Sequence, residues 1–211
     1  MKNIKMIIIL LVGSVASLFA KQGDWTFGAG TQLMMQTKGL SDLYHPGFGF
    51  NFSINKFIIS QGSVGFQYSG NYISGKEPKY LNSGFGDLTN KNWAMNHDFV
   101  LNFKYYLSSK DKGVSPLIGL ESGLSLLYTT DRFEDVYGNQ FLKNDRTHVL
   151  YCISPLVGLS LPIKDRITAN LILKYTWTLF KEDEANHYVE PWSDFDSFQH
   201  FDVQLTFNFK L

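Results

Sequence analysis

Residues 201–211 alternate strictly between apolar and polar side chains. The apolar positions are Phe201, Val203, Leu205, Phe207, Phe209 and Leu211, and the positions between them are all polar. Successive side chains of a β-strand point to opposite faces, so the segment predicts a strand with one apolar and one polar face. A half-buried strand of a soluble sheet has this pattern, and so does a membrane strand that separates lipid from a polar interior.

Seven further segments alternate in the same way, and we expect each of them to form a strand. Together with residues 201–211, the expected strands are 24–36, 47–56, 63–74, 93–107, 116–128, 148–161 and 166–180. Each is long enough for the roughly 9–11 residues with which a tilted strand crosses a membrane. Pro155 lacks a backbone N–H for the sheet ladder, which favours a bulge in the middle of its strand.

The connections between these strands alternate in length. Long connections span 37–46, 75–92, 129–147 and 181–197, and short ones span 57–62, 108–115 and 162–165. Barrels of the outer membrane have long outer loops and short periplasmic turns, and an even strand count brings both ends of the barrel to the side of the turns. The sequence therefore predicts an all-β fold, an eight-stranded antiparallel up-and-down transmembrane β-barrel.

The first twenty residues have the layout of a secretory signal peptide. Lys2 and Lys5 precede an apolar run over 6–12, and small residues follow this run. The run is shorter than the ~20 apolar residues of a spanning helix, which argues against a membrane anchor. We expect a signal peptide over 1–20 and one barrel domain over 21–211.

The whole mature chain resembles the small eight-stranded outer-membrane barrel proteins of Gram-negative bacteria, and the outer membrane protein beta-barrel domain families common in Bacteroidota. The resemblance rests on this architecture and on Phe207, Phe209 and Leu211, which look like a barrel-assembly signal. Such signals usually end on Phe, and Leu211 keeps the last position apolar. The resemblance implies an outer-membrane location, contact with membrane lipids and lipopolysaccharide, insertion by the barrel-assembly machinery, a monomer, and no catalytic motif.

Charged residues fall on the polar side of several expected strands. They are Asp98, Lys104, Glu121, Lys174 and Asp202. An eight-stranded barrel is only wide enough inside for its own side chains, and buried charges must pair to offset their loss of water. We expect these residues to form a polar network that plugs the lumen, with Glu121 paired to Lys104 or Lys174. A small gated pore is the alternative.

The five histidines offer little for catalysis. A lipid A deacylase or acyltransferase on a similar barrel would need a histidine beside a serine and a carboxylate. His97 and Asp98 are neighbours on one strand and so point to opposite faces, and His148 with Ser154 is the other candidate pair. We expect no enzyme, cofactor or metal, with such a lipid-modifying enzyme as the alternative. The run of Asp183, Glu184, His187 and Glu190 is acidic, and such runs are usually solvated.

Composition and the aromatic residues indicate the location and the partners of the protein. Its 19 basic and 19 acidic residues balance, which argues against nucleic acid as a partner. Trp25 and Tyr105 fall near one expected membrane interface, and Trp93 and Trp177 fall near the other, as membrane belts require. A lipocalin-like soluble barrel would instead hold the bulky apolar face inside, where it would overfill a small lumen. We expect a role in envelope structure, or in surface interaction and adhesion, through four long loops with an unknown ligand.

Overall fold

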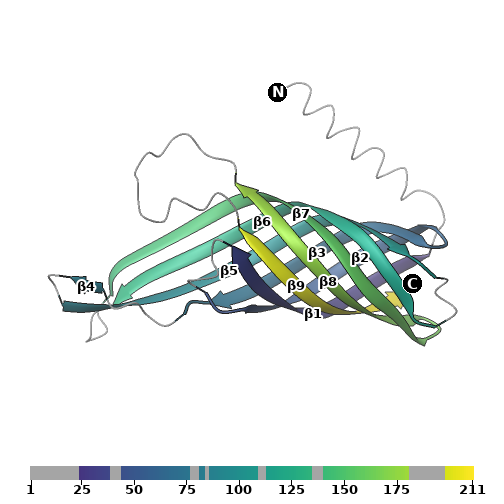
Figure 1. Cartoon of the computed structure of the whole chain (residues 1–211), viewed down its shortest axis with the longest axis horizontal. Coiled ribbons are helices and arrows are strands. Elements are labelled where there is room, and N and C mark those ends of the chain that lie inside the picture. The colour runs from purple at the N-terminus through teal and green to yellow at the C-terminus, as the bar shows by residue number, and fades with distance from the viewer. Residues whose placement is uncertain are drawn as a thin grey trace, which may run out of the picture.

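The structure, a computed structural model, describes residues 24–38, 44–76, 81–83, 86–108, 113–134, 140–180 and 198–211. These residues form β-strands joined by turns (Figure 1). None of the described segments is a helix with the length and apolar character needed to cross a membrane. The expected signal peptide over 1–20 lies outside the described residues.

Eight strands close into one antiparallel barrel. They are β1 (Trp25–Lys38), β2 (Gly47–Ile59), β3 (Gly62–Ser74), β5 (Gly86–Tyr106), β6 (Ser115–Glu134), β7 (Gln140–Lys164), β8 (Ile167–Phe180) and β9 (Gln199–Lys210). Each barrel strand pairs with the next along the chain, and β9 pairs with β1 to close the ring. The short strand β4 (Leu81–Ser83) pairs only with the start of β5. The expected eight-stranded up-and-down barrel is confirmed.

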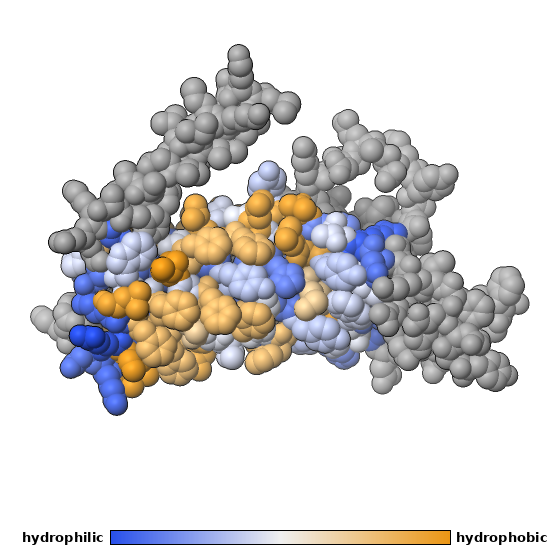
Figure 2. Space-filling view, turned by 180° about the vertical axis from the view of Figure 1, so that it is seen from behind, coloured by the Kyte–Doolittle hydropathy of each residue, from blue (hydrophilic) through white to orange (hydrophobic). Residues whose placement is uncertain are grey.

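The two faces of the strands differ as the alternation predicts. On β2, Phe48 and Phe50 are 64% and 45% exposed, while Asn51 and Ser53 are almost fully buried. Outward residues of the other strands are likewise mostly large and apolar, and inward ones mostly small or polar. Figure 2 shows the outward residues as an apolar band with hydrophilic residues at both ends. Such a band is what a barrel presents to lipid.

The two ends of the barrel are built differently. At one end, called here the short-turn end, tight turns over 60–61 and 165–166 join neighbouring strands. The start of β1 and the end of β9 meet there, where the Leu211 amide donates to the carbonyl of Trp25. At the opposite end, called the long-loop end, part of the sheet continues beyond the ring of strands (Figure 1).

Three strands extend further at the long-loop end than the sequence predicted, so the loops expected over 75–92 and 129–147 are partly wrong. β5, β6 and β7 continue as a paired sheet, and only residues 135–139 separate β6 from β7. The pairing runs out through Arg132 and Lys143 to the end of β6. In the sequence, residues 86–92, 129–134 and 140–147 are mostly polar. Backbone hydrogen bonds hold such a hairpin together outside lipid, so no alternation marks it in the sequence.

Pro155 does not produce the expected bulge. Ile153 pairs with Trp177 and Leu156 with Lys174, so the register of β7 on β8 is the same on both sides of the proline. Pro155 points outward, and the backbone pairs next to it on β8 are missing. The hydroxyls of Ser154 and Thr176 lie 2.8 Å apart at this gap. That side-chain hydrogen bond bridges the strands where the proline has no N–H to donate.

Candidate functional site

A chain of charged groups crosses the middle of the lumen. Lys174 Nζ on β8 lies 3.1 Å from Glu121 Oε2 on β6 and 3.6 Å from Asp202 Oδ2 on β9. His200 Nε2 lies 3.3 Å from the same Asp202 oxygen, although the two atoms are not aligned for a hydrogen bond. All four side chains are almost completely buried. One ammonium group therefore neutralises two carboxylates from neighbouring parts of the barrel wall.

The five charged residues expected in the lumen all point inward, but the structure brings only three of them together. Glu121 pairs with Lys174, two strands away, and not with Lys104 on the adjacent strand. Lys104 is 3% exposed and forms no ion pair with any described residue. Asp98 instead accepts a hydrogen bond from Asn96 at 2.9 Å.

Neutral polar side chains extend this network around the lumen. Gln204 on β9 donates to Gln32 on β1, and Gln32 donates to Asn71 on β3, each at 2.8 Å. Ser125 on β6 donates to Asn96 on β5 at 2.7 Å. Amides and hydroxyls can both donate and accept, so they extend hydrogen bonding between strands of a narrow interior.

The sequence reading missed two apolar clusters inside the lumen. On β6 the inward residues Leu117, Glu121 and Leu127 follow one another from the short-turn end to the long-loop end. The charged residues therefore lie between two apolar layers. The long-loop cluster is Met34, Tyr44, Ile73, Ala94, Leu127, Leu150 and Phe198, and the short-turn cluster is Tyr106, Leu117, Leu156 and Ile172, with Phe57 against it. The sequence pattern that could have predicted these clusters is the presence of apolar residues at inward positions near the ends of the strands.

Aromatic side chains ring the barrel at both limits of the apolar band. At the long-loop end the Trp93 ring lies 6.2 Å from the ring of Tyr72 and 5.3 Å from that of Tyr128. Tyr105 marks the short-turn end, where its hydroxyl donates to Gln61 at 2.8 Å. Twelve residues of a tilted strand separate Trp93 from Tyr105, about 30 Å along the barrel axis, which matches the core of a bilayer.

Solved structures share this architecture. The attachment invasion locus protein Ail of Yersinia pestis aligns with a TM-score of 0.54 at 11% identity, over 90% of this chain and all of that one. Neisserial surface protein A gives 0.52 at 13% identity, also over 90% of this chain and all of that one. A major outer membrane protein of Thermus thermophilus gives 0.53 at 10%, over 89% and 99%. The chain has the fold of the small outer-membrane β-barrels. No family model and no curated protein matches its sequence.

The histidines of this barrel are not arranged as a catalytic triad in the part that the structure describes. His97 faces outward, where its Nδ1 lies 2.8 Å from the Tyr68 hydroxyl and its cross-strand neighbours are Gly70 and Leu126. His200 has a carboxylate nearby but is fully buried in the lumen. His148 and Ser154 lie six residues apart on β7, about 20 Å along a strand, and do not meet.

Metal-binding groups are also scattered. Within the described ranges, no three His, Cys, Asp or Glu side chains come together as metal ligands. The acidic run of Asp183, Glu184, His187 and Glu190 lies outside the described residues. The only cysteine, Cys152, is buried with a free thiol.

The residues expected to form an assembly signal lie on the lipid face of β9 and just beyond it. Phe207, Phe209 and Leu211 are 40%, 42% and 75% exposed. Their outward position follows from the alternation that predicted the strand. Their role in assembly stays a prediction.

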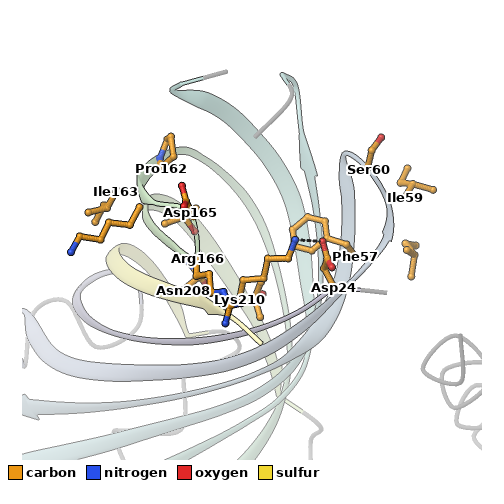
Figure 3. A pocket seen from close by; sticks show the side chains of 14 residues that line it. Asp24, Phe57, Ile59, Ser60, Pro162, Ile163, Asp165, Arg166, Asn208 and Lys210 are labelled. Atoms are coloured by element: carbon orange, nitrogen blue, oxygen red, sulfur yellow. Dashed lines mark ion pairs between the residues drawn. The ribbon is translucent and has the colours of Figure 1, made fainter. Parts of the chain in front are cut away.

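The lumen opens into a vestibule at the short-turn end (Figure 3). This cavity has a volume of about 880 Å³. The start of β1, the end of β9 and the turns after β2 and β7 form its walls. The short-turn cluster lies next to it, because Phe57 both lines the vestibule and packs on Tyr106 at a ring distance of 5.6 Å.

Proposed function

We propose that this outer-membrane barrel acts at the cell surface by presenting the outer part of β5, β6 and β7 to an external ligand. The observation that carries the proposal is the continuation of these strands as a paired sheet beyond Trp93. β5 begins seven residues before Trp93, so the sheet reaches roughly 20 Å past the aromatic ring along the strand. A preformed sheet offers a ligand an ordered surface at a lower entropic cost than a flexible loop.

The arrangement of the lumen supports an anchoring barrel over the alternative of a pore. A path for ions would have to cross both apolar clusters, and apolar constrictions resist wetting. Between them, Lys174 holds Glu121 and Asp202 in ion pairs that would have to break. We propose that the lumen is a structural plug.

The surroundings of the histidines support a role without catalysis. His97 faces outward and is half-buried, with no serine or carboxylate among its cross-strand neighbours, and His200 is enclosed in the lumen. Among structures of this fold, the names of Ail, an attachment invasion locus protein, and of Neisserial surface protein A agree with a surface role. We also propose that the barrel works as a monomer, in contact with lipopolysaccharide, after insertion by the barrel-assembly machinery.

A shortened hairpin tests the proposal. Asp131 and Asn144 are paired, so replacing residues 132–143 with the dipeptide Asn-Gly closes the hairpin with a two-residue turn near the membrane. Cells that display the natural protein should adhere to a basement-membrane extract, and cells with the shortened hairpin should lose most of this adherence. A control with Ser60→Asn and Gln61→Gly places the same dipeptide in the turn at the opposite end.

The control should adhere like the natural protein, with equal amounts of folded barrel in all three strains. The proposal would be overturned if the shortened variant adhered as well as the natural protein. It would also be overturned if cells with the natural protein adhered no better than cells without it. Single-channel recordings in planar bilayers form a parallel arm. Steady conductance by the natural barrel would contradict the plug.

A further inference from the structure

The vestibule at the short-turn end has the size and position of a ligand site. Its volume of about 880 Å³ lies within the range of small-molecule pockets, roughly 300–1,000 Å³. In Figure 3, Asp24 and Lys210 lie between two turns, one carrying Ile59 and Ser60 and the other carrying Asp165 and Arg166. The surface proposed for adhesion lies at the other end of the barrel. A ligand here would therefore reflect a separate activity.

Part of the vestibule wall is apolar and continues the lipid face. Ile58, Ile59 and Ile163 line the cavity and are 38%, 56% and 52% exposed. Ile163 follows Leu161 at the end of β7, and Ile58 lies beyond Ile54 on β2, with Lys56 between these two and its Nζ over the ring of Trp25. A hydrocarbon chain can therefore pass from the bilayer to the rim of the vestibule along apolar side chains.

The rim of the vestibule also carries cations that have no ion-pair partner among the described residues. Lys210 Nζ lies 2.6 Å from Asp24 Oδ2. Lys164 ends β7 and Arg166 lies on the turn after it. Both are exposed, and no described acidic side chain forms an ion pair with either of them. Once Asp24 is paired with Lys210, two cations face the single carboxylate of Asp165. This surplus favours an anionic group, and phosphate suits a guanidinium and an ammonium together.

The deeper wall of the vestibule supplies neutral hydrogen-bonding groups. Thr26, Thr168 and Asn208 come from three different strands and all line the cavity. A hydroxyl or amide can bind a phosphate ester oxygen or a hydroxyl of a polar headgroup. The site thus combines an apolar flank, a cationic rim and a polar interior. A phospholipid has its acyl chains, its phosphate and the terminal group of its head in the same order.

We infer that the vestibule binds the headgroup of an anionic phospholipid from the inner leaflet of the outer membrane. Short turns of outer-membrane barrels face the periplasm, so the lipids within reach are those of the inner leaflet. The phosphate lies between Lys164 and Arg166, and the acyl chains lie along Ile58, Ile59 and Ile163. Basic pockets at the edge of membrane proteins bind anionic headgroups by the same physics.

Native mass spectrometry of the full barrel in dodecyl maltoside tests this inference. The probes are phosphatidylglycerol and phosphatidylethanolamine with the same acyl chains. The natural barrel should bind one phosphatidylglycerol at least five times more tightly than phosphatidylethanolamine. Arg166→Gln, and more strongly Lys164→Gln with Arg166→Gln, should remove this preference. Arg146→Gln removes one positive charge at the long-loop end and should leave it unchanged.

Further variants guard against a trivial loss of binding. Exchange of the two cations, Lys164→Arg with Arg166→Lys, should keep the preference, and Ile163→Asn should weaken binding of both lipids. Heat-modifiable gel migration reports whether each variant is folded. We expect all of them to fold, because the turn is exposed. Preference retained in the double glutamine variant would overturn the inference. Displacement of phosphatidylglycerol by an equal concentration of inorganic phosphate would overturn it too, because the site would then bind free anions.

Discussion

The lipid face and the lumen of this barrel are made of alternate residues of the same strands, yet they are stabilised in different ways. Leu120 is 45% exposed on the outside of β6, and Glu121 beside it is completely buried inside. Lipid is fluid and fills the space around any apolar side chain, so the outer face requires only apolar character. A buried charge requires a particular partner at a particular distance.

This difference predicts that substitutions on the two faces lower the free energy of unfolding for different reasons. A charge placed on the lipid face should lower the free energy of unfolding by an amount that depends on its depth in the membrane. A substitution in the lumen should lower it by an amount that depends on the buried partner that loses its contact. The free energy of unfolding in lipid vesicles, measured by reversible urea titration, distinguishes the two. Equal losses of unfolding free energy from paired substitutions on the two faces would contradict this difference.

The largest loss is expected from Glu121→Ala in the lumen. It leaves Lys174 with Asp202 alone and should lower the free energy of unfolding by about 3–5 kcal/mol. Leu120→Ala on the outside of the same strand should cost less, because lipid fills the space. A loss below about 1 kcal/mol for Glu121→Ala, in a fully folded variant, would show that the ion pair is not the buried support described here.

A charge on the lipid face should come next. Leu124 is outward near the middle of β6, and Leu124→Arg should cost about 2–4 kcal/mol in vesicles. Leu161 is equally exposed but lies close to the turn over 165–166, so Leu161→Arg should cost about 1 kcal/mol or less. Equal losses at the two depths would mean that the apolar band is not centred on the membrane as its aromatic rings indicate.

Most of the fold was predictable, because the alternation that defines it is local. The facing of Glu121 and Leu124 follows from parity alone. The choice of Lys174 over Lys104 does not, because it depends on how neighbouring strands are offset around the barrel. The extension of β6 and β7 was also not predictable, since outside lipid and core no face has to be apolar.

Two glycines, one facing the lumen and one facing outward, differ in the space around their Cα atoms. A Cβ on inward Gly123 would clash with the fixed backbone oxygen of Phe99, whereas one on outward Gly70 would meet the movable hydroxyl of Tyr68 at 3.0 Å. Gly123→Ala should therefore cost about 1–3 kcal/mol through overpacking. Gly70→Ala should be within about 1 kcal/mol of neutral, because Ala is the better strand residue. The reverse order in urea titrations would mean that the lumen relaxes more easily than the lipid face.

The smallest effect is expected where a lysine and a carboxylate lie closest. Lys210 and Asp24 are 2.6 Å apart, a shorter distance than the 3.1 Å between Lys174 and Glu121, but both side chains of the outer pair are about half exposed. Water and salt screen an exposed pair, so Asp24→Asn should cost less than about 1 kcal/mol, and nothing measurable in 1 M salt. Titrations at low and high salt check this, with Glu121→Gln as the buried counterpart, whose loss should persist at both. A salt-independent loss for Asp24→Asn would mean that the short-turn end is as shielded as the lumen, and that distance matters more than burial in this barrel.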